Sequence, residues 1–225
     1  MIRLSNIKIS GLEGAIRGMR NPHNSWDKSD SYICPKDIDC KKCNTNLDSH
    51  YFDSSICYVL GENDYKLAES LVRAGNDHSK FLRQIFISID ITAPLYWWKE
   101  MDTYKVGTVA NSESTMHSIH KQPFNIDMFS VDSKKLQNIY NSQLIPLLEE
   151  YRTQYLETKD MGIWLDIIQL LPTSFNQMRT WSANYQVLRN IYNARKDHKL
   201  KEWRNFCIAL EFIPYGELIT LPKTT

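Results

Sequence analysis

The chain has 225 residues, of which 42% are hydrophobic and 24% are charged, and its formal net charge is +1. This ordinary globular composition excludes disorder, collagen and coiled coil as the dominant character. No apolar run approaches the roughly 18 residues of a membrane helix, and the first residues lack the apolar stretch of a signal peptide. The sequence therefore predicts a cytoplasmic protein without a membrane partner.

The first half of the chain predicts short strands, short helices and one long polar segment. Alternation over 2–9 predicts an edge strand with a slip in its middle. Residues 11–18 read as a short helix weakened by three glycines. Residues 21–60 predict a long loop, with a polar, cysteine-containing insert at about 26–60. Asn63 and Asp64 are candidate caps for a helix over 65–75.

The rest of the chain predicts one clear strand followed mainly by helices. Ile85, Ile87, Ile89 and Ile91 fall on one face of a strand over 84–92, and a helix starts at Tyr96. Residues 107–117 are small and polar and read as a site-like loop. Apolar spacing predicts helices over 133–157, 160–171 and 182–210. Neither a repeat nor a clear linker is visible, so we expect a single domain over 1–225.

Four cysteines lie close together in the insert. Cys34, Cys40, Cys43 and Cys57 follow C-x5-C-x2-C-x13-C spacing, and four thiolates could close a tetrahedral zinc site. The alternative is a set of reduced thiols, because disulfides are rare in the cytosol. Cys207 falls on an apolar helix face and reads as a core residue.

The charges are segregated along the chain. Residues 27–64 hold eight acidic and four basic residues, whereas 179–204 hold seven basic and two acidic ones. Within the basic segment, Arg195 lies on the apolar face predicted for the helix over 182–210, with His198 on its flank. A guanidinium there must reach out to solvent, pair with a carboxylate or hold an anionic ligand such as a phosphate. The basic segment is open to two interpretations, an anion site or a solvated helix face.

Amide side chains precede this arginine on the same predicted helix. Asn184, Gln186, Asn190 and Asn193 each offer a donor and an acceptor, which suits the edge of a heterocycle. The run from Leu171 to Arg195 resembles the flavin-dependent thymidylate synthases, which have Leu-Pro followed by an Asn-x-Arg-x-Leu-x-(Asn/His) segment and an Arg. The matching residues, without a gap, are Asn184, Leu188, Asn190 and Arg195. His198 and Glu202 match the family's following His and Glu if one residue is deleted.

The resemblance extends upstream, over about 80–215 in all. The family's Gln-x-x-Arg-His-Arg-x-x-Ser motif aligns with Glu100, Thr103, Tyr104, Lys105 and Thr108. Its next motif aligns with 111–117 if one residue is inserted. Several of the family's phosphate-binding arginines are replaced here. Met116 and Met178 stand at two arginine positions, although Arg179 is adjacent to the second.

The resemblance implies a ThyX-like α+β fold, in which an antiparallel sheet is flanked by a helical bundle. It implies FAD as cofactor, a folate as possible one-carbon donor, a pyrimidine nucleotide as substrate, transfer to C5, and a homotetramer. The implied cofactor-binding residues are Tyr104, Lys105, Asn184, Gln186, Asn190 and His198. The implied substrate-binding residues are Glu100, Thr108, Asn111, Ser112, Ser114, Arg179 and Arg195.

Two other functions fit the same residues. The replaced arginines suit a non-catalytic nucleotide- or flavin-binding protein on the same scaffold, because each lost charge-assisted bond removes roughly 1.5–3 kcal/mol of binding. The cysteines and the basic segment would suit a zinc-stapled nucleic-acid binder, in which Trp181 and Tyr185 stack on bases. The sequence leaves open whether catalysis survives, and it makes nucleic acid the less favoured partner.

Overall fold

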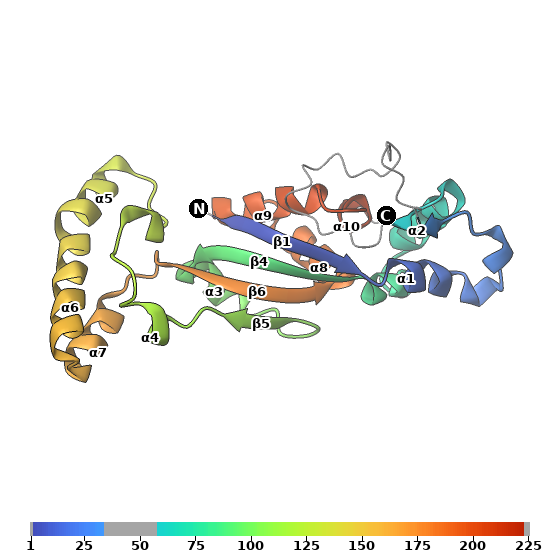
Figure 1. Cartoon of the computed structure of the whole chain (residues 1–225). Coiled ribbons are helices and arrows are strands. Elements are labelled where there is room, and N and C mark those ends of the chain that lie inside the picture. The colour runs from blue at the N-terminus through green and yellow to red at the C-terminus, as the bar shows by residue number, and fades with distance from the viewer. Residues whose placement is uncertain (1, 34–57, 223–225) are drawn as a thin grey trace, which may run out of the picture. The chain divides into compact units, whose positions relative to one another are not determined.

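The computed structural model describes residues 2–33 and 58–222 (Figure 1). Its strands are β1 (Arg3–Ser10), β2 (Tyr32–Ile33), β3 (Tyr58–Val59), β4 (Phe86–Pro94), β5 (Val109–Ser112) and β6 (Asn176–Asn184). Its helices are α1 (Leu12–Met19), α2 (Glu62–Ala74), α3 (Leu95–Met101), α4 (Thr115–Ser118), α5 (Lys134–Ile139), α6 (Ile145–Thr158), α7 (Met161–Leu170), α8 (Tyr185–Arg195), α9 (Lys201–Glu211) and α10 (Glu217–Thr220).

The main sheet is antiparallel and has the strand order β1-β4-β6-β5. A separate two-stranded sheet pairs β2 with β3, with Tyr32 opposite Val59 and Ile33 opposite Tyr58. The α+β class predicted from the sequence is therefore confirmed. No helix of the described residues is both long and apolar enough to span a bilayer.

The clearest predicted strand is confirmed as β4. Ile87, Ile89 and Ile91 are at most 1% exposed, because strand side chains point alternately to opposite faces and these three share the buried one. The edge strand predicted over 2–9 is also confirmed as β1. Its slip lies at Asn6, which has a φ of 49° and donates a side-chain hydrogen bond of 2.6 Å to Asp90.

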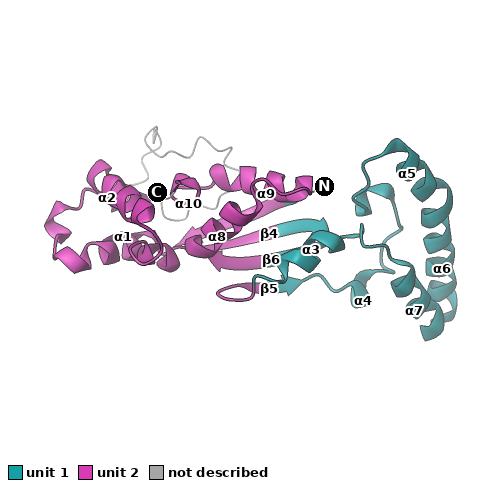
Figure 2. Cartoon of the chain, turned by 180° about the vertical axis from the view of Figure 1, so that it is seen from behind, with its two compact units in different colours: residues 1–3, 91–104, 110–180 teal, residues 4–90, 105–109, 181–225 magenta. Residues whose placement is uncertain are grey.

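The contacts divide the chain into two compact units (Figure 2). Unit 1 comprises 1–3, 91–104 and 110–180, and unit 2 comprises 4–90, 105–109 and 181–225. The chain thus passes between the units several times, and β4 and β6 each contribute residues to both. The single domain expected from the sequence stays a prediction.

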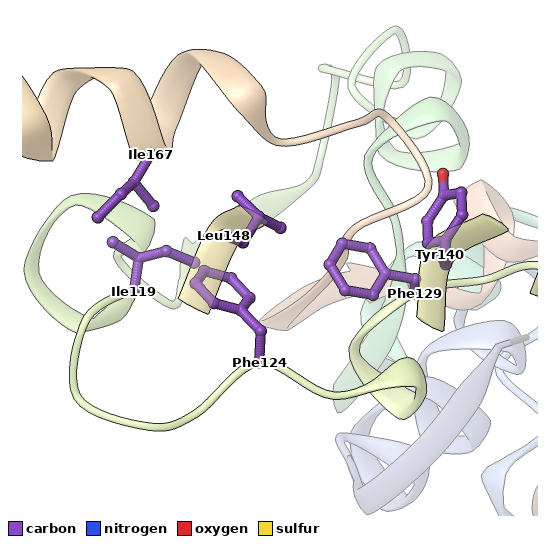
Figure 3. Close-up of a cluster of buried hydrophobic side chains, with 6 residues drawn as sticks. All are labelled: Ile119, Phe124, Phe129, Tyr140, Leu148 and Ile167. Carbon is purple, nitrogen blue, oxygen red and sulfur yellow. The ribbon is translucent and has the colours of Figure 1, made fainter. Parts of the chain in front are cut away.

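Unit 1 contains an apolar cluster built from α6, α7, the π-helical turn before α6 and the segment that follows α4 (Figure 3). The cluster consists of Ile119, Phe124, Phe129, Tyr140, Leu148 and Ile167. A π-helical turn over Tyr140–Leu144 joins α5 to α6, and Pro146 occupies the first turn of α6. Proline has no N–H and clashes with the carbonyl four residues earlier, so a regular α-helix cannot run through this point. The helix predicted over 133–157 therefore has a wider turn in its middle.

Unit 2 contains a buried ion pair between α1 and α2. Arg20 Nε lies 2.5 Å from Asp64 Oδ1, and the side chains are 5% and 0% exposed. The hydroxyls of Ser29 and Ser31 each donate to the second carboxylate oxygen at 2.6 Å. Asp30 accepts hydrogen bonds from the backbone N–H groups of residues 63 and 64, so α2 starts at Glu62 and is capped by a residue distant in sequence. The predicted local cap was wrong, since Asp64 is a buried ion-pair partner.

The long helix predicted over 182–210 was wrong. Its first residues belong to β6, and a turn over 196–200 separates α8 from α9. Arg204 Nη1 stabilises this turn by donating to the carbonyl oxygens of His198 and Lys199 at 2.6 and 2.8 Å. Treating 182–210 as one helix therefore placed Arg195 on a continuous apolar face, which the two separate helices do not form.

Candidate functional site

The start of α8 lies beside the polar loop 105–109 in unit 2. Asn184 caps α8, since its side-chain oxygen accepts a hydrogen bond of 3.0 Å from the backbone N–H of Val187. Gly107 has a φ of 73°, and a Cβ built on it would lie 3.5 Å from Asn184 Nδ2. The loop that holds Lys105 and Thr108 thus contacts the first turn of α8, where helix N–H groups favour anions.

The first two turns of α8 carry a network of amide side chains. Gln186 is 6% exposed, and its Nε2 donates to Asn190 Oδ1 at 3.0 Å and to Asn76 Oδ1 at 3.4 Å. The hydroxyl of buried Ser79 lies 3.4 Å from Gln186 Oε1. Gln186 and Asn190 were predicted from the sequence, whereas Asn76 and Ser79, which follow α2, were not.

Arg195 ends α8 and is partly buried rather than centred on an apolar face. Its guanidinium carbon lies 5.0 Å from the ring centroid of Trp203 on α9, within the range of a cation–π interaction. The His198 ring lies edge-on to the same tryptophan at 6.2 Å, and His198 Nδ1 accepts from the N–H of Leu200. The structure thus brings Arg195 and His198 to one tryptophan in unit 2.

A different arginine of α8 is buried. Arg189 is 1% exposed and donates from Nη1 to the carbonyl oxygen of Ile219 at 2.8 Å, whereas its Nη2 is buried without a hydrogen-bond partner among the described residues. Burial lowers the pKa of this guanidinium. Its burial was not predicted, because the apolar face was derived for one continuous helix over 182–210. Arg189 follows Leu188 directly and therefore falls outside that face.

Arg179 lies on β6 within unit 1 and is held by its neighbours. Its Nη1 forms a 2.8 Å ion pair with Asp102, and its guanidinium carbon lies 4.3 Å from the ring centroid of Trp98. Its Nε also donates to the side-chain oxygen of Gln177 at 3.0 Å. An anionic ligand at Arg179 would therefore have to compete with Asp102.

The other predicted substrate residues of unit 1 lie on and around β5. Asn111 and Ser112 are exposed on β5, and the N–H of Glu113 donates to the carbonyl of Met178 at 2.9 Å, which places the end of β5 beside β6. Ser114 caps the short α4. Glu100 and Tyr104, at and just after the end of α3, are partly buried.

The predicted zinc ligands Cys34, Cys40, Cys43 and Cys57 lie outside the described residues. Among the residues described, no group of three or more His, Cys, Asp or Glu could hold a metal ion. The predicted core cysteine, Cys207, is 2% exposed, and burial, with smaller effects from nearby charges, raises its pKa to about 12. A thiol with this pKa is not a nucleophile near neutral pH.

Unit 2 also contains a hollow of about 360 Å³ lined by residues of α1, β2 and β3. The Arg17 guanidinium lies 5.6 Å from the Trp26 ring centroid at this hollow. None of the predicted site residues lines it. The predicted chemistry is therefore concentrated at α8 and at β5–β6 rather than here.

No protein-family model and no curated protein matches the sequence. Two crystal structures of the flavin-dependent thymidylate synthase ThyX from Helicobacter pylori with FAD and dUMP match in fold, each with TM-score 0.65 and 16% identity over 98% of this chain. The matches cover 100% and 97% of those chains. A UMP/dUMP methylase, PolB from Streptomyces cacaoi bound with 5-Br dUMP, matches with TM-score 0.59 and 13% identity over 99% of this chain and 96% of that one. At low identity but over its full length, the chain has the ThyX-like fold of the flavin-dependent thymidylate synthases.

Proposed function

We propose that the chain binds FAD and transfers a one-carbon unit, as methylene or hydroxymethyl, reductively to C5 of a pyrimidine deoxynucleotide. The observation that supports this most is the full-length likeness in fold to structures that hold FAD and dUMP. The likeness to a UMP/dUMP methylase adds support for the substrate class. When bound, the cofactor would supply hydride and a folate would supply the carbon, while C5 loses its proton.

The residues of unit 2 suit the cofactor. The first turn of α8 offers backbone N–H groups, and Asn184 keeps its Nδ2 as a donor because only its oxygen caps the helix. Lys105, in the loop against this turn, is exposed and would contact a phosphate. We propose Lys105, Asn184, Asn190 and His198 as cofactor contacts here. Arg195 and Thr108 would serve the substrate.

Unit 1 contains its own set of predicted polar site residues. We propose Tyr104 as a cofactor contact. Four side chains here would hydrogen-bond the substrate: Glu100, Asn111, Ser112 and Ser114. Arg179 is the candidate for the substrate phosphate, with guanidinium geometry that matches two phosphate oxygens.

FAD titration of the purified protein tests this proposal. We expect uptake of FAD with flavin absorbance, and we expect Lys105→Met to weaken binding about 10- to 100-fold, since a charge-assisted bond contributes roughly 1.5–3 kcal/mol. Lys121→Met, also at an exposed lysine, is the control and should bind FAD like the original chain. A colourless protein that takes up no FAD would contradict the proposal.

A non-catalytic binding protein on the same scaffold is the second candidate. It is favoured by the Asp102–Arg179 ion pair, which opposes phosphate binding at Arg179. It predicts that FAD binds, and dUMP only weakly, without turnover, and that a thymidylate auxotroph is not rescued. Consumption of a methylene folate that depends on dUMP would exclude it.

Asp102→Asn tests whether Arg179 can contact a phosphate. Removing the competing carboxylate should strengthen dUMP binding about two- to five-fold, because Asp102 is 53% exposed and an exposed ion pair is weak. Binding of deoxyuridine, which has no phosphate, should not change. Isothermal titration of both ligands measures the difference, with Asp166→Asn as a control in the same unit. A similar gain for deoxyuridine would argue against a phosphate contact.

We also propose that the protein is a homotetramer. Large apolar side chains are exposed on α6 and α7, among them Leu147, Leu156, Met161 and Leu165. Burying such side chains in an interface is favourable by roughly 25 cal/mol per Å² of apolar surface. Light scattering after size-exclusion chromatography would give the mass, and a monomer at micromolar concentration would contradict this proposal.

A further inference from the structure

We infer that Gln186 is a positioning residue that turns the amides of Asn76 and Asn190 outward as a pair of N–H donors. The two asparagines would then select a ligand that presents hydrogen-bond acceptors, such as phosphate or carbonyl oxygens. Naming FAD as that ligand rests on the proposed function, whereas the orientation of the amides does not. Asn76 comes from the turn after α2 and has no role in the proposal above.

The contacts place one buried amide between two exposed ones. Gln186 is 6% exposed, whereas Asn76 and Asn190 are both exposed. Both asparagine side-chain oxygens lie within hydrogen-bond distance of the same Gln186 nitrogen, at 3.4 and 3.0 Å. Asn190 is one helical turn beyond Gln186 on α8, so the helix itself holds this pair together.

The contacts of the Gln186 amide give the direction of the network. An amide nitrogen has two hydrogens, and the two asparagine oxygens take both from Gln186. Behind Gln186, the hydroxyl of Ser79 approaches its oxygen at 3.4 Å and the carbonyl oxygen of Gly75 at 3.1 Å. In the structure, the Gln186 oxygen lies on the side of buried Ser79 and its nitrogen on the side of the two asparagines.

The asparagines therefore have their amide nitrogens left for a ligand. Each asparagine oxygen faces Gln186, so each Nδ2 points to the other side of its carboxamide. A ligand whose edge presents hydrogen-bond acceptors is favoured. A ligand edge with N–H donors would leave both its own donors and the asparagine donors unpaired, which is unfavourable once water is excluded. Gln186 itself is too buried to contact much of any ligand, which separates its role from that of Asn190.

Asn190→Asp tests the donor role in the full chain. Aspartate keeps the oxygen that accepts from Gln186 but replaces the outward donor with an acceptor. We expect FAD affinity to fall at least about 10-fold, as measured by FAD titration. Asn193→Asp adds the same charge at an exposed position of the same helix and should change affinity much less. Equal losses of FAD affinity in the two variants, or no loss in either, would overturn the inference. Neither result would contradict the proposal that the original chain binds FAD.

Side-chain amide NMR of the ligand-free protein tests the orientation without FAD. We expect the Gln186 amide hydrogens to exchange slowly with water and those of Asn76 and Asn190 to exchange fast. In Gln186→Met, the side-chain amide signals of Asn76 and Asn190 should change their chemical shifts, because each asparagine oxygen loses its hydrogen bond, whereas the Gln143 signal should not change. If the Gln186 hydrogens exchange as fast as those of exposed Gln143, the inference is wrong, whether or not the protein binds FAD.

Discussion

Asp64→Asn should lower the free energy of unfolding by about 3–5 kcal/mol, because it leaves the buried Arg20 guanidinium without its counter-charge. The same carboxylate accepts from the hydroxyls of Ser29 and Ser31, so the change also weakens the attachment of this segment to α2. Glu62→Gln, at an exposed ion pair with Lys66 on the same helix, is the control and should cause no measurable change. Urea unfolding followed by circular dichroism measures both. Equal effects in the two variants would contradict the buried pair.

The same ion pair predicts a loss of stability in acid. Burial alone would raise the pKa of Asp64, but hydrogen bonds from Ser29, Ser31 and Arg20 outweigh it and leave the pKa below its usual value. A depressed pKa means that the carboxylate stabilises the fold above the ordinary aspartate pKa of about 3.9, and that this contribution is lost as the pH falls below it. The difference in urea midpoint between the original chain and Asp64→Asn should therefore narrow below about pH 4.

Leu148→Ala should lower the free energy of unfolding by about 2–5 kcal/mol, because it opens a cavity in the apolar cluster of unit 1. Leu148 is 0% exposed, whereas its neighbour Leu147 is 38% exposed, so Leu147→Ala is a control with the same chemical change. We expect about 1 kcal/mol or less for the control. Thermal unfolding compares the two, and similar losses would show that α6 buries a different face.

The sequence predicted an element correctly where a strong apolar period coincides with the buried face of that element. The isoleucines of β4 alternate, and their burial confirms the predicted strand. β6 gave no such signal, since only Trp181 and Ala183 on it are buried and polar residues surround them. The long helix was wrong for a related reason, because the turn at 196–200 contains no glycine or proline to mark it. Arg204 holds that turn from the following helix, and such a contact cannot be inferred from local sequence.

The candidate site was predicted where its residues share one helix. Asn184, Gln186 and Asn190 are close in sequence, so the spacing alone placed them together on α8. Asn76 joins them from more than a hundred residues away, and only the fold shows it. Asp102 and Arg179 are likewise distant in sequence, so their pairing was invisible, although it decides how available Arg179 is to an anion.

The π-helical turn over Tyr140–Leu144 sets the direction of two anchor side chains. Tyr140 and Leu148 are eight residues apart, and in an uninterrupted α-helix their side chains would point about 80° apart around the helix axis. The wider turn takes up most of that rotation, so that Tyr140 packs on Phe129 while Leu148 packs in the same cluster. Deleting one residue within this turn should rotate Tyr140 relative to Leu148 and swing the phenol away from Ser174, which it now contacts at 2.8 Å. A π-helical turn holds one residue more than an α-helical turn. That additional residue sets the rotation of the side chains before the turn relative to those after it.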